Sequence, residues 1–181
     1  MTTPHESVAV LSRALDQAGD VLAGVHADQL SDPTPCENWT VERLIAHLLA
    51  TPRNFIEMTT GGQPDWSATP PVPEDWAGAF RASADDLIHL WHEVEPDADT
   101  SQADWQTAEF AVHTWDLARA TGQSTDLDPQ VAERGLAFMS ATMKPEMRGD
   151  AFGAEVSVPD DAPVYERLAA FAGRDPARAH A

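Results

Sequence analysis

The chain has 181 residues, of which 43% are hydrophobic, and its 30 acidic and 11 basic residues give a formal net charge of −19. This length and apolar fraction predict one compact domain over 1–181 and exclude wholesale disorder. The negative charge repels phosphate backbones and anionic lipids, so neither a nucleic acid nor a membrane surface is expected as a partner.

Cysteine content and the N-terminus indicate the compartment. Cys36 is the only cysteine, which excludes an intrachain disulfide and a cysteine-rich zinc knuckle and favours a reducing environment. The opening "MTTPHESVAV" lacks the basic and apolar segments of a signal peptide, and no run of about 18 apolar residues occurs. We therefore expect a cytoplasmic protein.

The first third of the chain predicts two helices. Apolar residues recur near the 3.6-residue period over 6–30, which is typical of a long amphipathic helix. Pro33 and Pro35 then hold the chain extended. A second helix is predicted to begin near Thr40, whose hydroxyl can cap it.

The middle of the chain predicts a loop and two further helices. Residues 61–76 contain four prolines and two glycines and are predicted to form a loop. Helices are predicted over 76–94 and 105–121, separated by the breaking segment 95–102. Gly122 stands where a left-handed residue commonly ends a helix.

The C-terminal part predicts two more helices and completes the fold class. One is predicted over 128–143, with Asp128 as its N-cap and Pro129 in its first turn. A short last helix is predicted within 162–173. Because almost no stretch has the pattern of a β-strand, the sequence predicts an all-α helical bundle.

Three residues form a candidate metal site. Glu109 and His113 are four apart in a predicted helix, so both face one side. His47 interrupts the apolar run "LIAHLLA" and could supply a third ligand from a facing helix. The alternative is one hydrogen-bonded core histidine beside a surface carboxylate. His89 and His92 form a weaker candidate pair beside acidic residues.

Three segments resemble one protein family. "PTPCENWTVERLIAHL" (33–48), "AEFAVHTWDLARATGQ" (108–123) and the C-terminal stretch 148–176 resemble the mycothiol-dependent maleylpyruvate isomerase N-terminal, or DinB-like, metal-binding family. The resemblance covers about a third of the chain, in the same order along it.

The resemblance implies a fold and a ligand set. It implies a DinB-like four-helix bundle with a crossover connection, in which His47, Glu109 and His113 bind a divalent metal, usually zinc. Nickel or iron would also suit these donors. It implies a mycothiol-type thiol as cosubstrate. The separate C-terminal domain of the full-length isomerase has no counterpart here, so isomerisation of maleylpyruvate itself is not expected.

Residues around the candidate site have open roles. Asp116 could accept a hydrogen bond from a ligand imidazole and is the one candidate catalytic group, or it could form an ion pair with Arg119 on the helix flank. Trp39 and Trp115 could wall a pocket or belong to the core. We do not expect Cys36 to be a nucleophile, because "PTPC" has the pattern of a rigid segment that buries a small side chain.

Three functions follow from these candidates. The first is a metal-dependent transferase that joins a low-molecular-weight thiol to a small-molecule electrophile. The second is a metal-dependent hydrolase, and the third is a non-catalytic, metal-stabilised module that binds a small ligand or a partner protein. A homodimer through a bundle face is compatible with the pattern, although no heptad seam demands it.

Overall fold

The computed structural model describes residues 4–94, 99–149 and 152–178. In these ranges the chain forms helices and no β-strand, so the predicted all-α class is confirmed. The α-helices are α1 (Pro4–Ala23), α2 (Val41–Thr59), α3 (Trp76–His92), α4 (Ser101–Ala120), α5 (Pro129–Thr142) and α6 (Val164–Phe171), and the 3-10 turns are η1 (Ala27–Gln29) and η2 (Pro145–Met147).

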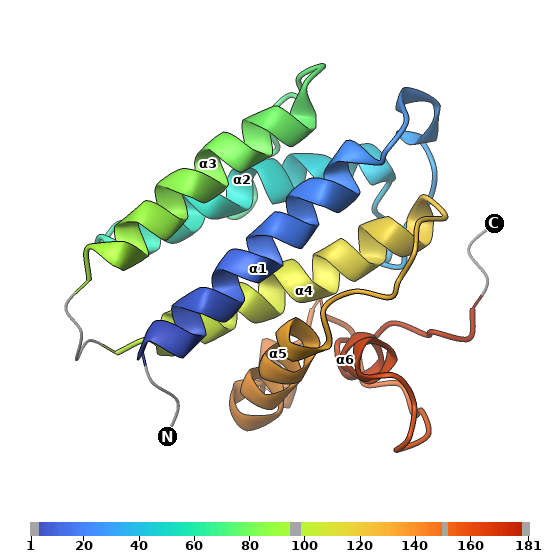
Figure 1. The fold of residues 1–181 in the computed structure, drawn as a ribbon. Helices are drawn as coiled ribbons and strands as arrows, with labels where there is room; N and C mark the ends of the chain where they lie inside the picture. The colour runs from blue at the N-terminus through green and yellow to red at the C-terminus, as the bar shows by residue number, and fades with distance from the viewer. Residues whose placement is uncertain (1–3, 95–98, 150–151, 179–181) are drawn as a thin grey trace.

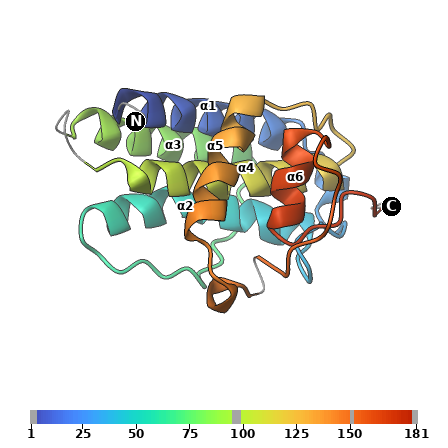
Figure 2. The same ribbon diagram turned by 90° about the horizontal axis from the view of Figure 1, so that it is seen from below.

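The first four helices form the bundle (Figure 1). Helix α1 packs against α3 and α4, and α2 packs against the same two helices. Figures 1 and 2 show α1 and α4 running in one direction and α2 and α3 in the other. The loop 60–75 therefore travels back along the bundle to join the parallel neighbours α2 and α3. This connection is the predicted crossover, so the DinB-like bundle topology is confirmed.

Helices α5 and α6 lie across one side of the bundle, over α4 (Figure 2). Gly135 permits the close approach of α5, because a Cβ atom there would lie 3.1 Å from the Cα of Ala108. With α1, α2, α5 and α6 all packed against it, α4 is the central helix. Its functional side chains are consequently shielded from bulk water.

Apolar side chains from all six helices form one core. Leu11, Leu44, Phe80, Phe110 and Leu168 are fully buried within it. Among the described residues, no helix is both long and apolar enough to cross a membrane.

Most helix ends lie within two residues of their predicted positions, because local caps fix them. Thr40 Oγ1 accepts a hydrogen bond from the backbone N–H of Arg43, and Asp128 caps α5. Gly122 has the predicted left-handed conformation, with φ 67°. Two ends differ from the predictions, since the helix predicted over 6–30 ends at Ala23 and the helix predicted from 105 begins at Ser101.

Candidate metal centre

Helix α2 positions His47. The backbone forms an isolated β-bridge between Pro33 and Thr40, which sets the start of the helix, and Leu44 and Leu48 are buried in the core. His47 lies in the second turn, and its side chain is only 15% exposed.

Helix α4 positions the remaining candidates. Glu109 is 7% exposed, while His113 and Asp116 have no exposed surface. The interpretation of Glu109 as an ordinary surface carboxylate is therefore wrong. It is buried because α2 packs on one side of α4 and α5 on another.

The three candidate ligands come together. His47 Nε2 lies 2.7 Å from Glu109 Oε1, and His113 Nε2 lies 3.3 Å from the same oxygen. One donor atom from each residue lies within 4.8 Å of the other two. Two imidazoles and a carboxylate at this spacing match the ligand set that zinc accepts.

One buried atom tests whether a metal fits this group. His113 Nε2 is buried and makes no well-aligned hydrogen bond among the described residues, although it lies in ion-pair contact with Glu109 Oε1 at 3.3 Å. A buried polar atom without a hydrogen bond costs free energy, about 1–3 kcal/mol. A cation between Nε2 and the neighbouring donors would satisfy this atom, so the residues present fit a metal ion.

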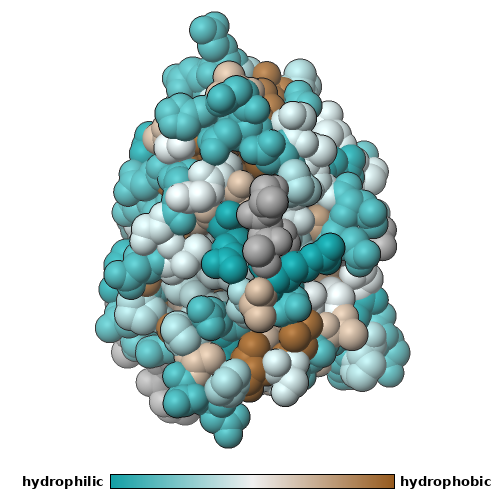
Figure 3. Space-filling model, turned by 90° about the vertical axis from the view of Figure 1, so that its right-hand side faces the viewer, coloured by the Kyte–Doolittle hydropathy of each residue, from teal (hydrophilic) through white to brown (hydrophobic). Residues whose placement is uncertain are grey.

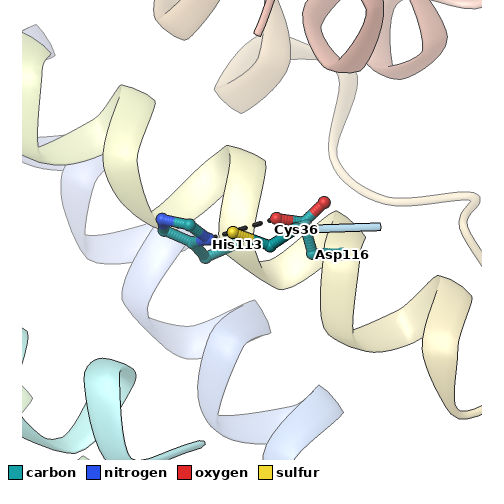
Figure 4. A group of neighbouring side chains, drawn as sticks. All are labelled: Cys36, His113 and Asp116. Carbon is teal, nitrogen blue, oxygen red and sulfur yellow. Dashed lines mark hydrogen bonds and ion pairs between the residues drawn. The ribbon is translucent and has the colours of Figure 1, made fainter. Parts of the chain in front are cut away.

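Asp116 orients the ring of His113 (Figure 4). Its Oδ2 lies 3.1 Å from His113 Nδ1. When the ring is neutral, a hydrogen on Nδ1 leaves the lone pair of Nε2 free to bind a metal on the side of Glu109. A carboxylate behind a histidine ligand commonly fixes its tautomer in this way.

Arg174 is the cation paired with Asp116. Its Nη2 lies 2.7 Å from Asp116 Oδ2, and its Nε donates to Oδ1 at 3.0 Å. The suggested ion pair between Asp116 and Arg119 is therefore wrong, because Arg119 instead donates to the backbone oxygen of Pro176.

The charges of the group are strongly coupled. Burial alone would lower the pKa of His113, but the carboxylates of Glu109 and Asp116 raise it to about 9. Burial likewise opposes the charge on Glu109, yet the two imidazoles hold its pKa well below the usual range. His47 differs, because burial lowers its pKa and the hydrogen bond to Glu109 only partly offsets this. Without a metal, His113 is therefore a positively charged imidazolium near pH 7, whereas His47 is a neutral imidazole.

Cys36 lies beside His113 and Asp116, as Figure 4 shows. It is 1% exposed, and burial, together with the nearby carboxylates, raises the pKa of its thiol to about 12. Such a thiol is almost entirely protonated at neutral pH, and a thiol reacts through its thiolate form. The geometry agrees with the expectation that Cys36 is a buried small side chain and no nucleophile.

Aromatic rings enclose the histidines. Trp39 stacks on His113 with ring centroids 5.8 Å apart and meets the edge of His47 at 5.0 Å. Phe152 lies 6.0 Å from the His113 ring. Trp115 is buried in the core, so of the two tryptophans considered from the sequence only Trp39 walls the site.

The sequence gives no signal for two residues that lie at the site. Arg174 and Phe152 lie in segments without helical periodicity, and a lone arginine after a glycine carries no signal of burial.

The weaker candidate pair, His89 and His92, lies outside the site. His89 is exposed, and its Nε2 lies 3.5 Å from Glu93 Oε1. Within the described ranges, His89 and His92 belong to no group of three potential ligands.

Comparison with known proteins identifies the family of the chain. The profile of the mycothiol maleylpyruvate isomerase N-terminal domain matches residues 11–105. Two uncharacterized proteins of Mycobacterium tuberculosis, Rv0738 of strain H37Rv and MT0763 of strain CDC 1551, are each 34% identical over 182 residues, which is 90% of this chain and 94% of the relative. No solved structure matches the chain. The chain therefore belongs to the mycothiol maleylpyruvate isomerase N-terminal domain family.

Proposed function

We propose that this protein binds a divalent metal and transfers a low-molecular-weight thiol of the mycothiol type to a small electrophile. The observation that carries the proposal is the convergence of three buried or nearly buried donors: Nε2 of His47 and Nε2 of His113 both lie within 3.3 Å of Glu109 Oε1, and His113 Nε2 makes no well-aligned hydrogen bond. The description of the family, which names mycothiol, supports the choice of thiol. Zinc is the first candidate metal, with nickel and iron as alternatives.

The donor set determines what the metal would contribute. A divalent metal held by His47, His113 and Glu109 would supply the positive charge that favours the thiolate form of a thiol near neutral pH. His47 and His113 would act as neutral donors and Glu109 as the one anionic donor.

Asp116 has a positioning role in this proposal. It accepts the hydrogen of His113 Nδ1 and is itself held by Arg174, so the ring cannot rotate freely. Hydrolysis would instead require Asp116 as a general base in contact with water. Asp116 has no exposed surface, which weighs against the hydrolase alternative.

One face of the molecule gives no support to a module that docks on a partner protein. A docking module of this kind would expose a large apolar patch. On the face in Figure 3, the residues drawn in colour are mostly hydrophilic and the apolar ones form small separate patches.

Metal content is the first test. About one equivalent of metal is expected in the wild type, purified without an affinity tag, and a near-complete loss in His47→Ala and His113→Ala, with the helical circular dichroism signal retained. His89→Ala is the matched control, because this histidine is exposed and belongs to no candidate group. Wild-type protein that takes up no metal on reconstitution would refute the site.

Turnover is the second test. Zinc-loaded protein should accelerate the conjugation of mycothiol with an electrophile, and His47→Ala should abolish the acceleration. Conjugation that proceeds at the uncatalysed rate with mycothiol and with other low-molecular-weight thiols would leave a metal-binding protein without the proposed activity.

A further inference from the structure

A cavity of about 300 Å³ lies between α4 and α5, directly beside the candidate metal centre. Glu109 belongs to both, since it is a candidate ligand and part of the cavity wall. Phe152 also joins the two, because it lines the cavity and its ring centroid lies 6.0 Å from that of His113. A molecule in the cavity would therefore lie next to the thiol that the metal centre is proposed to hold.

Aromatic rings and thioethers form most of the cavity wall. The rings belong to Trp105, Phe138 and Phe152, and three methionines follow one another at intervals of four residues. Met139 is buried and Met147 is 62% exposed, so the methionines extend from the floor of the cavity to its mouth. Methionine side chains are flexible and polarizable, and they adapt to apolar ligands of different shapes.

Among the described residues, none that lines the cavity has a cationic side chain. The polar side chains of the wall are the hydroxyl of Thr142 and the carboxylate of Glu109, apart from the weakly polar indole N–H of Trp105. Behind the wall, the guanidinium of Arg174 lies 5.6 Å from the centroid of the Phe152 ring. Its nitrogens donate to Asp116 and to the backbone oxygen of Ala172. An anion entering the cavity of the metal-free protein would lose its hydration without gaining a cationic partner from the described residues of the wall.

The volume limits the size of the ligand. An apolar cavity of about 150 Å³ holds one benzene molecule and stays dry when it is empty. The volume of 300 Å³ therefore suits one aromatic ring with several substituents, or an aliphatic molecule of the same size.

We infer that the electrophile of this protein is a neutral, largely apolar molecule of about this size, and that the cavity discriminates against carboxylates such as maleylpyruvate. This inference rests on the proposed thiol transfer for its chemistry, while the selectivity of the cavity can be measured without turnover.

The reaction can be written for a benzylic chloride. The thiolate sulfur forms a bond to the benzylic carbon as the carbon–chlorine bond breaks, and chloride leaves with the bonding electron pair. The proton lost by the thiol passes to the buffer. No oxidant or reductant is needed, because carbon exchanges one leaving group for one nucleophile.

Binding of two isosteric probes tests the cavity. Para-nitrotoluene is neutral, whereas para-toluate has the same shape and a negative charge. Ligand-observed NMR titration of the metal-free protein avoids direct binding of the carboxylate to the metal. Para-nitrotoluene should bind at least about tenfold more tightly than para-toluate. Equal affinities, tighter binding of para-toluate, or no binding of para-nitrotoluene would overturn the inference.

Variants of Met143 locate the binding site. Met143→Trp fills the cavity and should abolish the binding of para-nitrotoluene. Met143→Arg adds a cation to the wall and should raise the affinity for para-toluate at least about tenfold. Met58→Arg is the matched control, because Met58 is also half-buried but lies on α2 outside the cavity wall. The same gain in Met58→Arg would overturn the assignment of the probe to this cavity.

Turnover separates this inference from the proposed function. Zinc-loaded protein with mycothiol should convert para-nitrobenzyl chloride faster than para-(chloromethyl)benzoate, each relative to its uncatalysed rate. If para-nitrotoluene binds more tightly than para-toluate but neither chloride is converted, the result would support the cavity inference and refute the transferase. Turnover that favours the benzoate would support the transferase and overturn the cavity inference.

Discussion

Replacing Arg174 by methionine removes the cation that neutralises the buried carboxylate of Asp116. Arg174 is 3% exposed and Asp116 is fully buried, and their closest atoms are 2.7 Å apart. Removing one partner of a buried pair costs about 3–5 kcal/mol, because the remaining charge stays desolvated. Since the imidazole of His113 still lies 3.1 Å from Asp116, we expect the lower end of this range, about 3 kcal/mol.

Thermal unfolding of the metal-free protein measures this loss. In a chain of this size each kcal/mol lowers Tm by about 2–4 °C, so Arg174→Met should lower Tm by about 6–12 °C. Arg81→Met is the matched control, because Arg81 and Asp20 form an exposed pair at 2.8 Å, and such pairs contribute about 0–1 kcal/mol. Adding Asp116→Asn to Arg174→Met should restore part of the stability. A Tm for Arg174→Met equal to that of the control would refute the reasoning.

Four further predictions concern protonation, metal affinity and the thiol. Metal uptake near neutral pH should release about one proton per ion, because Glu109 and Asp116 outweigh burial and raise the pKa of His113 to about 9; titration calorimetry whose heat does not depend on the buffer would contradict this. The same shift stabilises the metal-free protein below the ordinary pKa of 6.5, and this stabilisation is lost as the pH rises through about 9, as Tm measured across this range will show. Asp116→Asn should weaken metal binding about 10–100-fold, and an unchanged affinity in competition with a chelating dye would show that Asp116 does not orient His113. Cys36, buried and with its pKa raised to about 12, should resist iodoacetamide until the protein unfolds, and mass spectrometry that finds rapid alkylation of the native protein would count against its burial.

The helices could be predicted because their signals are local. Apolar periodicity and the caps at Thr40 and Asp128 depend on residues a few positions apart, and the structure places helix starts directly after both. The end of α1 was missed because apolar residues continue in helical spacing beyond Gly24. The helix in fact stops directly before this glycine, which was the available stop signal, and His26 then adopts an extended conformation, with ψ 149°.

The candidate site shows the same division between local and distant signals. Glu109 and His113 could be paired from their spacing of four residues, and His47 was conspicuous within an apolar run. Arg174, in contrast, pairs with Asp116 across 58 residues. That contact depends on how the chain after α5 returns to α4, which periodicity does not specify. The cavity depends on the packing of α5 against α4, so it could not be predicted from the sequence either.

The position of the family match bears on how far substrates can be inferred from membership. The matched segment 11–105 contains His47, the whole of α2 and α3 and most of α1, but it ends within the second turn of α4, before Glu109 and His113. Apart from Trp105, the cavity wall consists of residues beyond the match, and Arg174 lies beyond it too. Members that share the matched segment can therefore share the scaffold and one candidate ligand while they differ in the residues that contact the electrophile. The charge and volume of the cavity wall, more than membership of the family, should decide which electrophile each member accepts.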